Sequence, residues 1–177
     1  FHLGKMADLA RLKKHFKSRI RMYGLITLKR NVYYNAKFGF PGWVRPLPSN
    51  RYVPLYQRSK IGVNIHNRGK YTLGNYRMFE LPANGVLQIS DGDDCLPYFF
   101  EEGKEIVGYR DMTDLIEKTE YYLSHENERI ELVANAYRAV LGRHRFSDRM
   151  AQLASIIRDG MKAASLGNAG LPGVVSG

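Results

Sequence analysis

The chain has 177 residues, of which 44% are hydrophobic and 25% are charged, which suffices for one substantial core but not for two. Its single cysteine, Cys95, excludes an internal disulfide, so packing must hold the fold. No apolar run is long enough to span a bilayer, and the start does not read as a signal peptide. We expect one domain over residues 1–165, followed by a disordered tail over residues 166–177, which lacks any periodic pattern.

Basic residues are concentrated in the first half of the chain. Residues 1–77 contain 17 Lys and Arg against one acid, Asp8, whereas residues 78–177 are acidic overall. Such an excess attracts phosphates, nucleic acid or an anionic membrane surface. A basic and well-solvated surface without a specific partner explains the same composition.

The first sixty residues show the weaker secondary-structure signals. Apolar residues at Leu9, Leu12 and Phe16 predict an amphipathic helix over residues 5–17. Alternation of apolar and basic residues predicts a strand over residues 19–23. Residues 25–41 are expected to be an irregular insertion with some helix. A short strand is expected over residues 43–47, and a helix over residues 51–59 with Pro54 in its first turn.

From residue 61 onward, strand and helix patterns alternate. The apolar run IGVNI predicts a buried strand, and the polar loop HNRGKYTLG leads to a helix near Asn75. Further strands are expected at Val86–Ile89 and at EIVGY, followed by helices over residues 111–123, 128–141 and 147–161. This order predicts an α/β fold with a doubly wound, mostly parallel, Rossmann-like sheet and closing carboxyl-terminal helices.

The helix near Asn75 is the strongest candidate for a binding site. Ligands of such sheets bind beyond the carboxyl ends of the strands, where loops lead into helices. The start of this helix suits a phosphate, and Arg77 adds a charge that can pair with phosphate oxygens. Glu80 can accept hydrogen bonds from the vicinal hydroxyls of a ribose. Alternatively, Arg77 and Glu80 form only a surface ion pair, worth about 0.2–0.5 kcal/mol.

Other residues with reactive side chains give weaker signals. His66, followed by Asn67, could bind a sugar or a phosphate, or could be structural. The acids of SDGDD are better explained by turn formation than by metal binding, and Cys95 by packing than by catalysis. The tyrosines and basic residues at 19–45 could stack on single-stranded nucleic acid, but no RNA-binding signature accompanies them.

Several blocks, in order along the chain, resemble the carboxyl-terminal domain of GT-B glycosyltransferases. They are SKIGVNIHNRG, NYRMFELPANGVLQISD, YFFEEGKEIVGYRDMTDLIEKTEYYLSHENER and RHRFSDR. The spore-maturation-type branch of glycosyltransferase group 1 is the nearest in pattern. The resemblance is dense over residues 56–155 and looser before them. Related sequences often have a proline where Pro82 stands, so a kinked helix is expected there.

The resemblance implies a lobe that holds a UDP- or GDP-linked sugar. It places Glu80 at the ribose hydroxyls, Asn75 and Arg77 at the diphosphate, and His66 and Asn67 in the adjoining loop. Retaining relatives often have a second glutamate eight residues before the first, and here that position is Thr72. The amino-terminal lobe, which binds the acceptor and commonly supplies a catalytic base, is expected to be missing, so the chain alone should be inactive.

We therefore interpret the chain as the donor-binding lobe of a bacterial glycosyltransferase that acts in polysaccharide synthesis in the cytoplasm. The nucleotide-sugar is a substrate, and neither a cofactor nor a metal is expected. Arg77 is the candidate for stabilising the leaving diphosphate. Residues 5–77 would serve an anionic acceptor or a membrane surface, and nucleic acid is not expected as a partner in this interpretation. The alternative is a non-catalytic basic module that binds nucleic acid or another polyanion.

Overall fold

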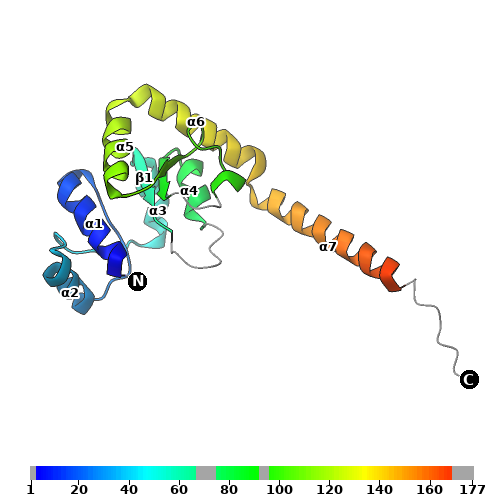
Figure 1. Ribbon diagram of the computed structural model, residues 1–177, viewed down its shortest axis with the longest axis horizontal. Coiled ribbons are helices and arrows are strands. Elements are labelled where there is room, and N and C mark those ends of the chain that lie inside the picture. Colours follow the sequence, from blue (N-terminus) through cyan, green and yellow to red (C-terminus); the bar gives the residue numbers. More distant parts are fainter. Residues whose placement is uncertain (1–2, 67–74, 92–95, 169–177) are drawn as a thin grey trace, which may run out of the picture.

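The computed structural model of the protein describes residues 3–66, 75–91 and 96–168 (Figure 1). Its centre is a parallel sheet of three strands in the order β1 (Ile61–Asn64), β2 (Leu87–Asp91) and β3 (Val107–Tyr109). Ile61 pairs with Leu87, and Ile89 pairs with Val107. Parallel pairing of consecutive strands requires crossover connections, so the carboxyl ends of all three strands lie at one edge. The predicted doubly wound α/β fold is confirmed.

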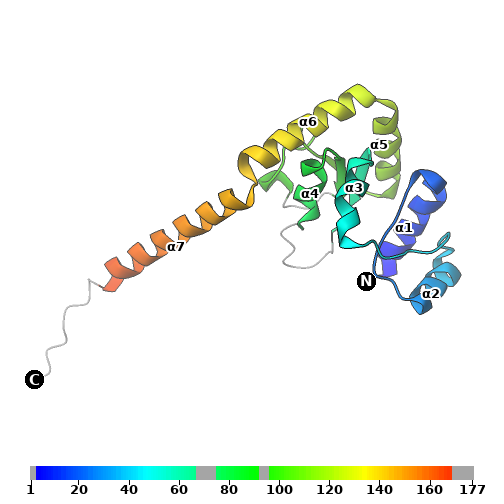
Figure 2. The ribbon, with the colours of Figure 1, turned by 180° about the vertical axis from the view of Figure 1, so that it is seen from behind.

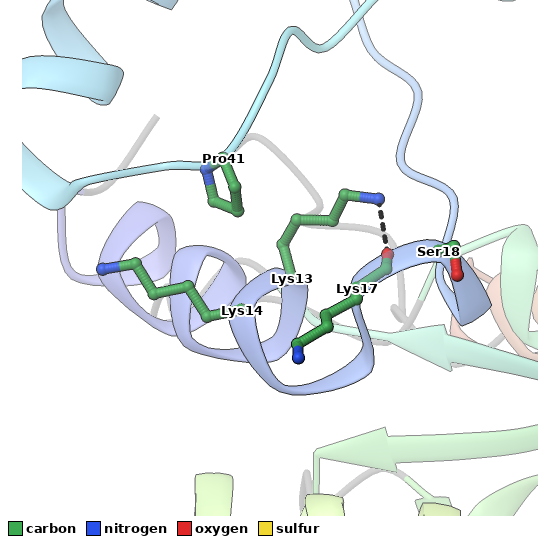
Figure 3. A pocket seen from close by; sticks show the side chains of 5 residues that line it. All are labelled: Lys13, Lys14, Lys17, Ser18 and Pro41. Carbon is green, nitrogen blue, oxygen red and sulfur yellow. Dashed lines mark hydrogen bonds between the residues drawn. The ribbon is translucent and has the colours of Figure 1, made fainter.

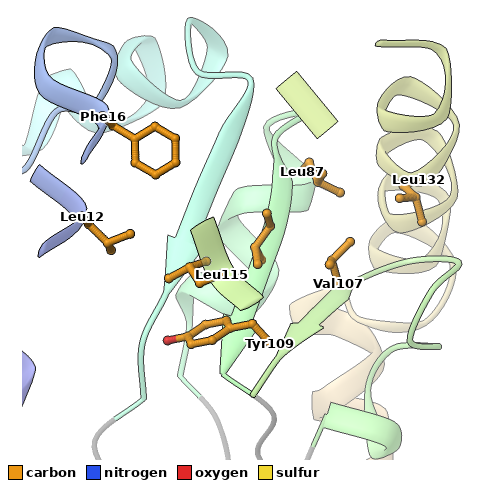
Figure 4. Close-up of a cluster of buried hydrophobic side chains, with 8 residues drawn as sticks. Leu12, Phe16, Leu87, Val107, Tyr109, Leu115 and Leu132 are labelled. Carbon is orange, nitrogen blue, oxygen red and sulfur yellow. The ribbon is translucent and has the colours of Figure 1, made fainter. Parts of the chain in front are cut away.

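Helices cover both faces of this sheet because side chains alternate along β2. Leu87 and Ile89 pack against Leu12 of α1 (Leu3–Phe16) and Leu115 of α5 (Met112–Ser124). Figure 4 shows this cluster, to which α6 (Glu126–Arg143) contributes Leu132. On the opposite face, α4 (Arg77–Ala83) packs its fully buried Met78 against the second half of α6. Both faces of the strands are therefore buried, as their apolar sequences predict.

A strand residue supplies the hydrogen bond that a proline removes from α4. Pro82 has no N–H, so the carbonyl of Met78 lacks its usual partner four residues further on. With the nitrogen of its side-chain amide turned toward α4, Gln88 donates to this carbonyl at 3.1 Å and to the carbonyl of Arg77 at 3.3 Å. A buried strand residue thus replaces the missing helical hydrogen bond and ties α4 to β2.

Gly62 sets the distance between α4 and β1. A Cβ atom at this position would lie 2.6 Å from Cδ2 and 2.8 Å from Cδ1 of Leu81, a buried residue of α4. We expect Gly62→Ala to lower the free energy of unfolding by about 1–3 kcal/mol, because the packed Leu81 side chain must move. Urea unfolding followed by circular dichroism measures this change.

Gly142 provides a matched control in α6, because a Cβ atom there would meet nothing within 4 Å. Gly142→Ala should raise the free energy of unfolding by about 0.4–1 kcal/mol, because alanine lowers the conformational entropy of the unfolded chain. If Gly62→Ala proves as stable as the unchanged protein, α4 is not held against β1 as the structure indicates.

The two strands predicted before residue 60 are wrong. Residues 19–23 and 43–47 contribute only an isolated parallel bridge between Tyr23 and Arg45, with a hydrogen bond from Gly24 N–H to the carbonyl of Arg45 at 3.1 Å. Pro46 and Pro48 cannot donate to a ladder, so pairing does not extend. Between these segments, α2 (Leu28–Phe38) is a regular helix, with the Thr27 side chain accepting a hydrogen bond at its start.

The remaining helices follow the sequence predictions more closely. The predicted helix over residues 51–59 corresponds to α3 (Tyr52–Gln57), and the side chain of Asp111 caps α5. The last helix, α7 (Phe146–Asn168), extends beyond the predicted end at residue 161 and runs away from the body of the protein (Figure 2). The tail predicted over residues 166–177 thus begins within α7, and residues 169–177 lie outside the described part of the chain.

Candidate functional site

Polar side chains are buried where β1 and β2 end. Asn64 is the last residue of β1 and is fully buried, and its partner in the strand register, Ser90, is fully buried as well. His66 follows two residues later with only 5% of its surface exposed. Burying polar groups costs free energy unless they are hydrogen-bonded, so such a concentration at one edge of a sheet indicates a site.

Asp91, the last residue of β2, holds His66 in a fixed orientation. Its carboxylate accepts the backbone N–H of His66 at 2.9–3.0 Å and lies 2.6 Å from Nδ1 of the imidazole. An ionised carboxylate can only accept, so Nδ1 must carry the hydrogen. The opposite nitrogen, Nε2, is buried without a hydrogen-bond partner among the described residues. When the ring is neutral this atom is an acceptor, and when the ring is protonated it is a donor.

A second hydrogen bond connects β1 to the segment before α4. The side-chain amide of Asn75 donates to Oδ1 of Asn64 at 3.0 Å, while its own Oδ1 is buried and has no partner in the described part of the chain. Among the described residues, three buried polar atoms at this edge therefore have no hydrogen-bond partner: His66 Nε2, Asn75 Oδ1 and Ser90 Oγ. A polar ligand would satisfy such atoms, because an unmet buried group costs about 1–3 kcal/mol.

Two cations lie at the same edge. Arg77 is the first residue of α4, and its side chain is exposed. Lys5 of α1 donates from its ammonium group to the carbonyl of Ile65, just beyond β1, at 2.8 Å. Burial lowers the pKa of Lys5, the positive charge of Arg77 lowers this pKa further, and Asp91 opposes both. Two cations that destabilise one another form a favourable place for an anion.

Glu80 is half-buried and lies against α3. Its Oε2 is 3.5 Å from the hydroxyl of Tyr56, and burial together with the negative charge of Glu80 raises the pKa of that tyrosine. The charge of Arg77 acts on the same hydroxyl in the opposite direction. Within the described residues no ion pair joins Arg77 and Glu80, so the surface-pair alternative is not what this structure contains.

Three of the five predicted site residues, His66, Asn75 and Arg77, lie at this edge of the sheet, and Glu80 lies further along α4, against Tyr56 of α3. Asn67, the fifth, lies outside the described residues, as do Thr72, Cys95 and most of the SDGDD turn. The helix contributes less than expected, because α4 has only 7 residues and its dipole is correspondingly small. Side chains rather than a helix terminus dominate the electrostatics of the edge.

Sequence reasoning missed the supporting residues Lys5, Tyr56, Asn64 and Asp91. Two of them carried a readable signal, because Asn64 and Asp91 are polar residues at the carboxyl ends of apolar strands, where ligands of α/β sheets bind. Lys5 and Tyr56 carried none, since each reaches the site from a distant helix. Among the described residues, no three His, Cys, Asp or Glu side chains gather as metal ligands would.

A separate basic hollow lies at the end of α1. Lys13, Lys14, Lys17, Ser18 and Pro41 line it (Figure 3). Two of the ammonium groups are already engaged, since Lys13 donates to the carbonyls of Lys17 and Ile20 and Lys14 donates to that of Phe38. None of the residues predicted for the site lines this hollow, so we treat it as part of the basic surface.

Comparison with known protein families identifies the chain. The family described as "Glycosyl transferase-like" matches residues 6–155, which include the whole sheet and the edge residues from Tyr56 to Asp91. A comparison with curated proteins gave no match. The family match covers well over half of the 177 residues. The chain therefore belongs to the glycosyl transferase-like family, and its role is the transfer of a glycosyl group from a donor to an acceptor.

Proposed function

We propose that the chain is the donor-binding, carboxyl-terminal lobe of a GT-B glycosyltransferase of the spore-maturation type. Its donor would be a sugar linked to UDP or GDP, bound at the carboxyl ends of β1 and β2. The observation that supports this most is the joint presence, at this edge, of two cations and of buried polar atoms without partners in the described part of the chain, with the half-buried Glu80 on the adjoining helix. Phosphates, ribose hydroxyls and a sugar supply the complementary groups.

Glu80 is proposed to bind the ribose of the donor. A carboxylate can accept one hydrogen bond on each oxygen, which suits two neighbouring hydroxyls. The hydroxyl of Tyr56 lies 3.5 Å from one of these oxygens, at the outer limit of a hydrogen bond, and Glu80 is half-buried, so its carboxylate has less freedom than an exposed one. Such preorganisation lowers the entropic cost of binding.

Arg77 and Lys5 are proposed to bind the diphosphate, with Asn75 and Asn67 at its side. Their charges would balance the negative charge that develops when the bond between the anomeric carbon and the phosphate oxygen breaks. The Nε2 atom of His66 is the buried group best suited to a hydroxyl of the transferred sugar or to a phosphate oxygen. In this scheme the cations replace a metal ion.

The second half of the site is proposed to belong to an amino-terminal lobe. The acceptor oxygen would attack the anomeric carbon as the diphosphate departs, and its proton would pass to a base on that lobe. The lobe described here would hold the donor and stabilise the leaving group. It would then bind the donor weakly by itself and complete no turnover.

Thermal-shift and calorimetric titrations of the two-lobe enzyme test the proposal. We expect UDP or GDP to raise the melting temperature in a dose-dependent manner, with ADP and inorganic phosphate as controls. Stabilisation by one nucleoside diphosphate identifies the donor class. Equal responses to all diphosphates and to phosphate would contradict a nucleotide site.

A further inference from the structure

The outward face of α2 combines exposed apolar and basic side chains. Leu28 and Val32 are one helical turn apart and are 69% and 55% exposed, and Leu25, three residues before Leu28, is 86% exposed. The buried side of the helix is occupied by Asn31 and Tyr34 instead. Leu28 and Val32 thus form an exposed aliphatic stripe on α2, and Leu25 is exposed in the segment that leads into the helix, which is unusual for a surface that meets only water.

Lys29 lies beside this stripe, and the other basic residues of α2 lie further round the exposed surface of the helix. Lys29 and Lys37 flank Tyr33, whose hydroxyl accepts a hydrogen bond from Lys37 at 2.7 Å, and Arg30 is exposed next to Lys29. The sequence contains no acid between Asp8 and Glu80, so nothing in this stretch neutralises these cations locally. The lysine-lined hollow of Figure 3 adds to the field, because Lys14 reaches the carboxyl end of α2 at the carbonyl of Phe38.

The position of α2 leaves this face accessible. The helix packs beside α1 and lies at the end of the body opposite to α7 in both views (Figures 1 and 2). None of its residues belongs to the donor site described above. A ligand of the α2 face, defined as Leu25, Leu28, Lys29, Arg30, Val32 and Lys37, therefore need not compete with a nucleotide.

We propose that the α2 face docks the protein onto an anionic membrane surface. The aliphatic stripe would enter the boundary between headgroups and acyl chains, while the cations remain at the headgroup phosphates. A nucleic acid would use the cations but leave the leucines exposed, and a second copy of the chain would bring like charges together. An anionic bilayer complements both halves of the face. No helix among the described residues is long and apolar enough to cross a membrane, so this contact would be peripheral.

Vesicle co-sedimentation of the 177-residue chain tests the α2 face without reference to nucleotide binding. We expect binding to phosphatidylcholine vesicles that contain phosphatidylglycerol, and little binding to phosphatidylcholine alone. The double variant Leu25→Ser, Leu28→Ser and the double variant Lys29→Glu, Arg30→Glu should each lower the partition coefficient by at least about tenfold. Raising the salt concentration should weaken vesicle binding as the Lys29→Glu, Arg30→Glu variant does, because both act on the electrostatic attraction to the headgroups.

Two exposed aliphatic residues of α7, Leu153 and Ile156, provide the matched control. The double variant Leu153→Ser, Ile156→Ser should bind vesicles as the unchanged chain does. Equal binding of the Leu25, Leu28 variant and the parent would overturn the proposal in favour of a purely electrostatic polyanion surface. A dimer in light scattering that dissociates in the same variant would overturn it in favour of self-association.

Discussion

Replacing Glu80 by alanine should weaken the binding of nucleoside diphosphate to the two-lobe enzyme by at least about 100-fold. Hydrogen bonds to a charged partner are worth about 1.5–3 kcal/mol each, and Glu80 is proposed to make two of them with the ribose. Half-burial already limits the motion of this carboxylate, whose Oε2 lies 3.5 Å from the hydroxyl of Tyr56. Isothermal titration calorimetry with UDP and GDP measures the change.

Two controls show whether the effect of Glu80→Ala comes from the ribose or from a general loss of charge or of folded structure. A 2′-deoxynucleoside diphosphate should bind the unchanged enzyme more weakly than its ribose counterpart, whereas the Glu80→Ala variant should bind both equally. Glu131, an exposed glutamate of α6, provides the control, and Glu131→Ala should leave both affinities unchanged. Unaltered UDP and GDP affinity in Glu80→Ala would remove the ribose role.

The sheet and the helices after residue 60 could be predicted because local patterns determine them. The run from Ile61 to Asn64 and the run from Leu87 to Asp91 are short, apolar and separated by one helix, which leaves few topologies besides a parallel pair. The same logic places Arg77 at the carboxyl edge and Glu80 one turn away, since any helix that follows a strand in such a sheet begins at that edge. The position of the candidate site follows from connectivity alone.

The contacts within the site could not be predicted in this way. Lys5 meets the carbonyl of Ile65 across 60 residues of sequence, and Tyr56 meets Glu80 across 24. Neither contact follows from the spacing of residues along the sequence, because the packing of α1 and α3 decides which of their side chains reach the site. The absent strands near Tyr23 and Arg45 have the same origin: alternation favoured extended chain, but a strand also requires a neighbour able to form a ladder.

Replacing Arg77 by alanine should lower kcat of the two-lobe enzyme by about 10²–10³-fold with a smaller effect on KM. Removing one preformed donor to a developing negative charge has consequences of this size in other active sites. Arg77 is the first residue of α4 and lies close enough to Lys5 for its positive charge to lower the pKa of Lys5. An arriving diphosphate would relieve their repulsion, so the pair should stabilise the departing group more than the intact donor. Single-turnover kinetics with the identified nucleotide-sugar separate this step from product release.

Two further variants distinguish a shared anion from independent surface charges. Arg77→Lys retains the charge but loses the two-pronged geometry, so its kcat should lie between those of the unchanged enzyme and Arg77→Ala. If Lys5 and Arg77 bind the same diphosphate, Lys5→Met combined with Arg77→Ala should cost less than the product of the single effects. Arg138, which hydrogen-bonds only within α6, is the control and should be replaceable by alanine without loss of kcat. Strictly multiplicative effects, or an unchanged kcat in Arg77→Ala, would show that the leaving group is stabilised elsewhere, because two charges acting on one anion cannot be independent.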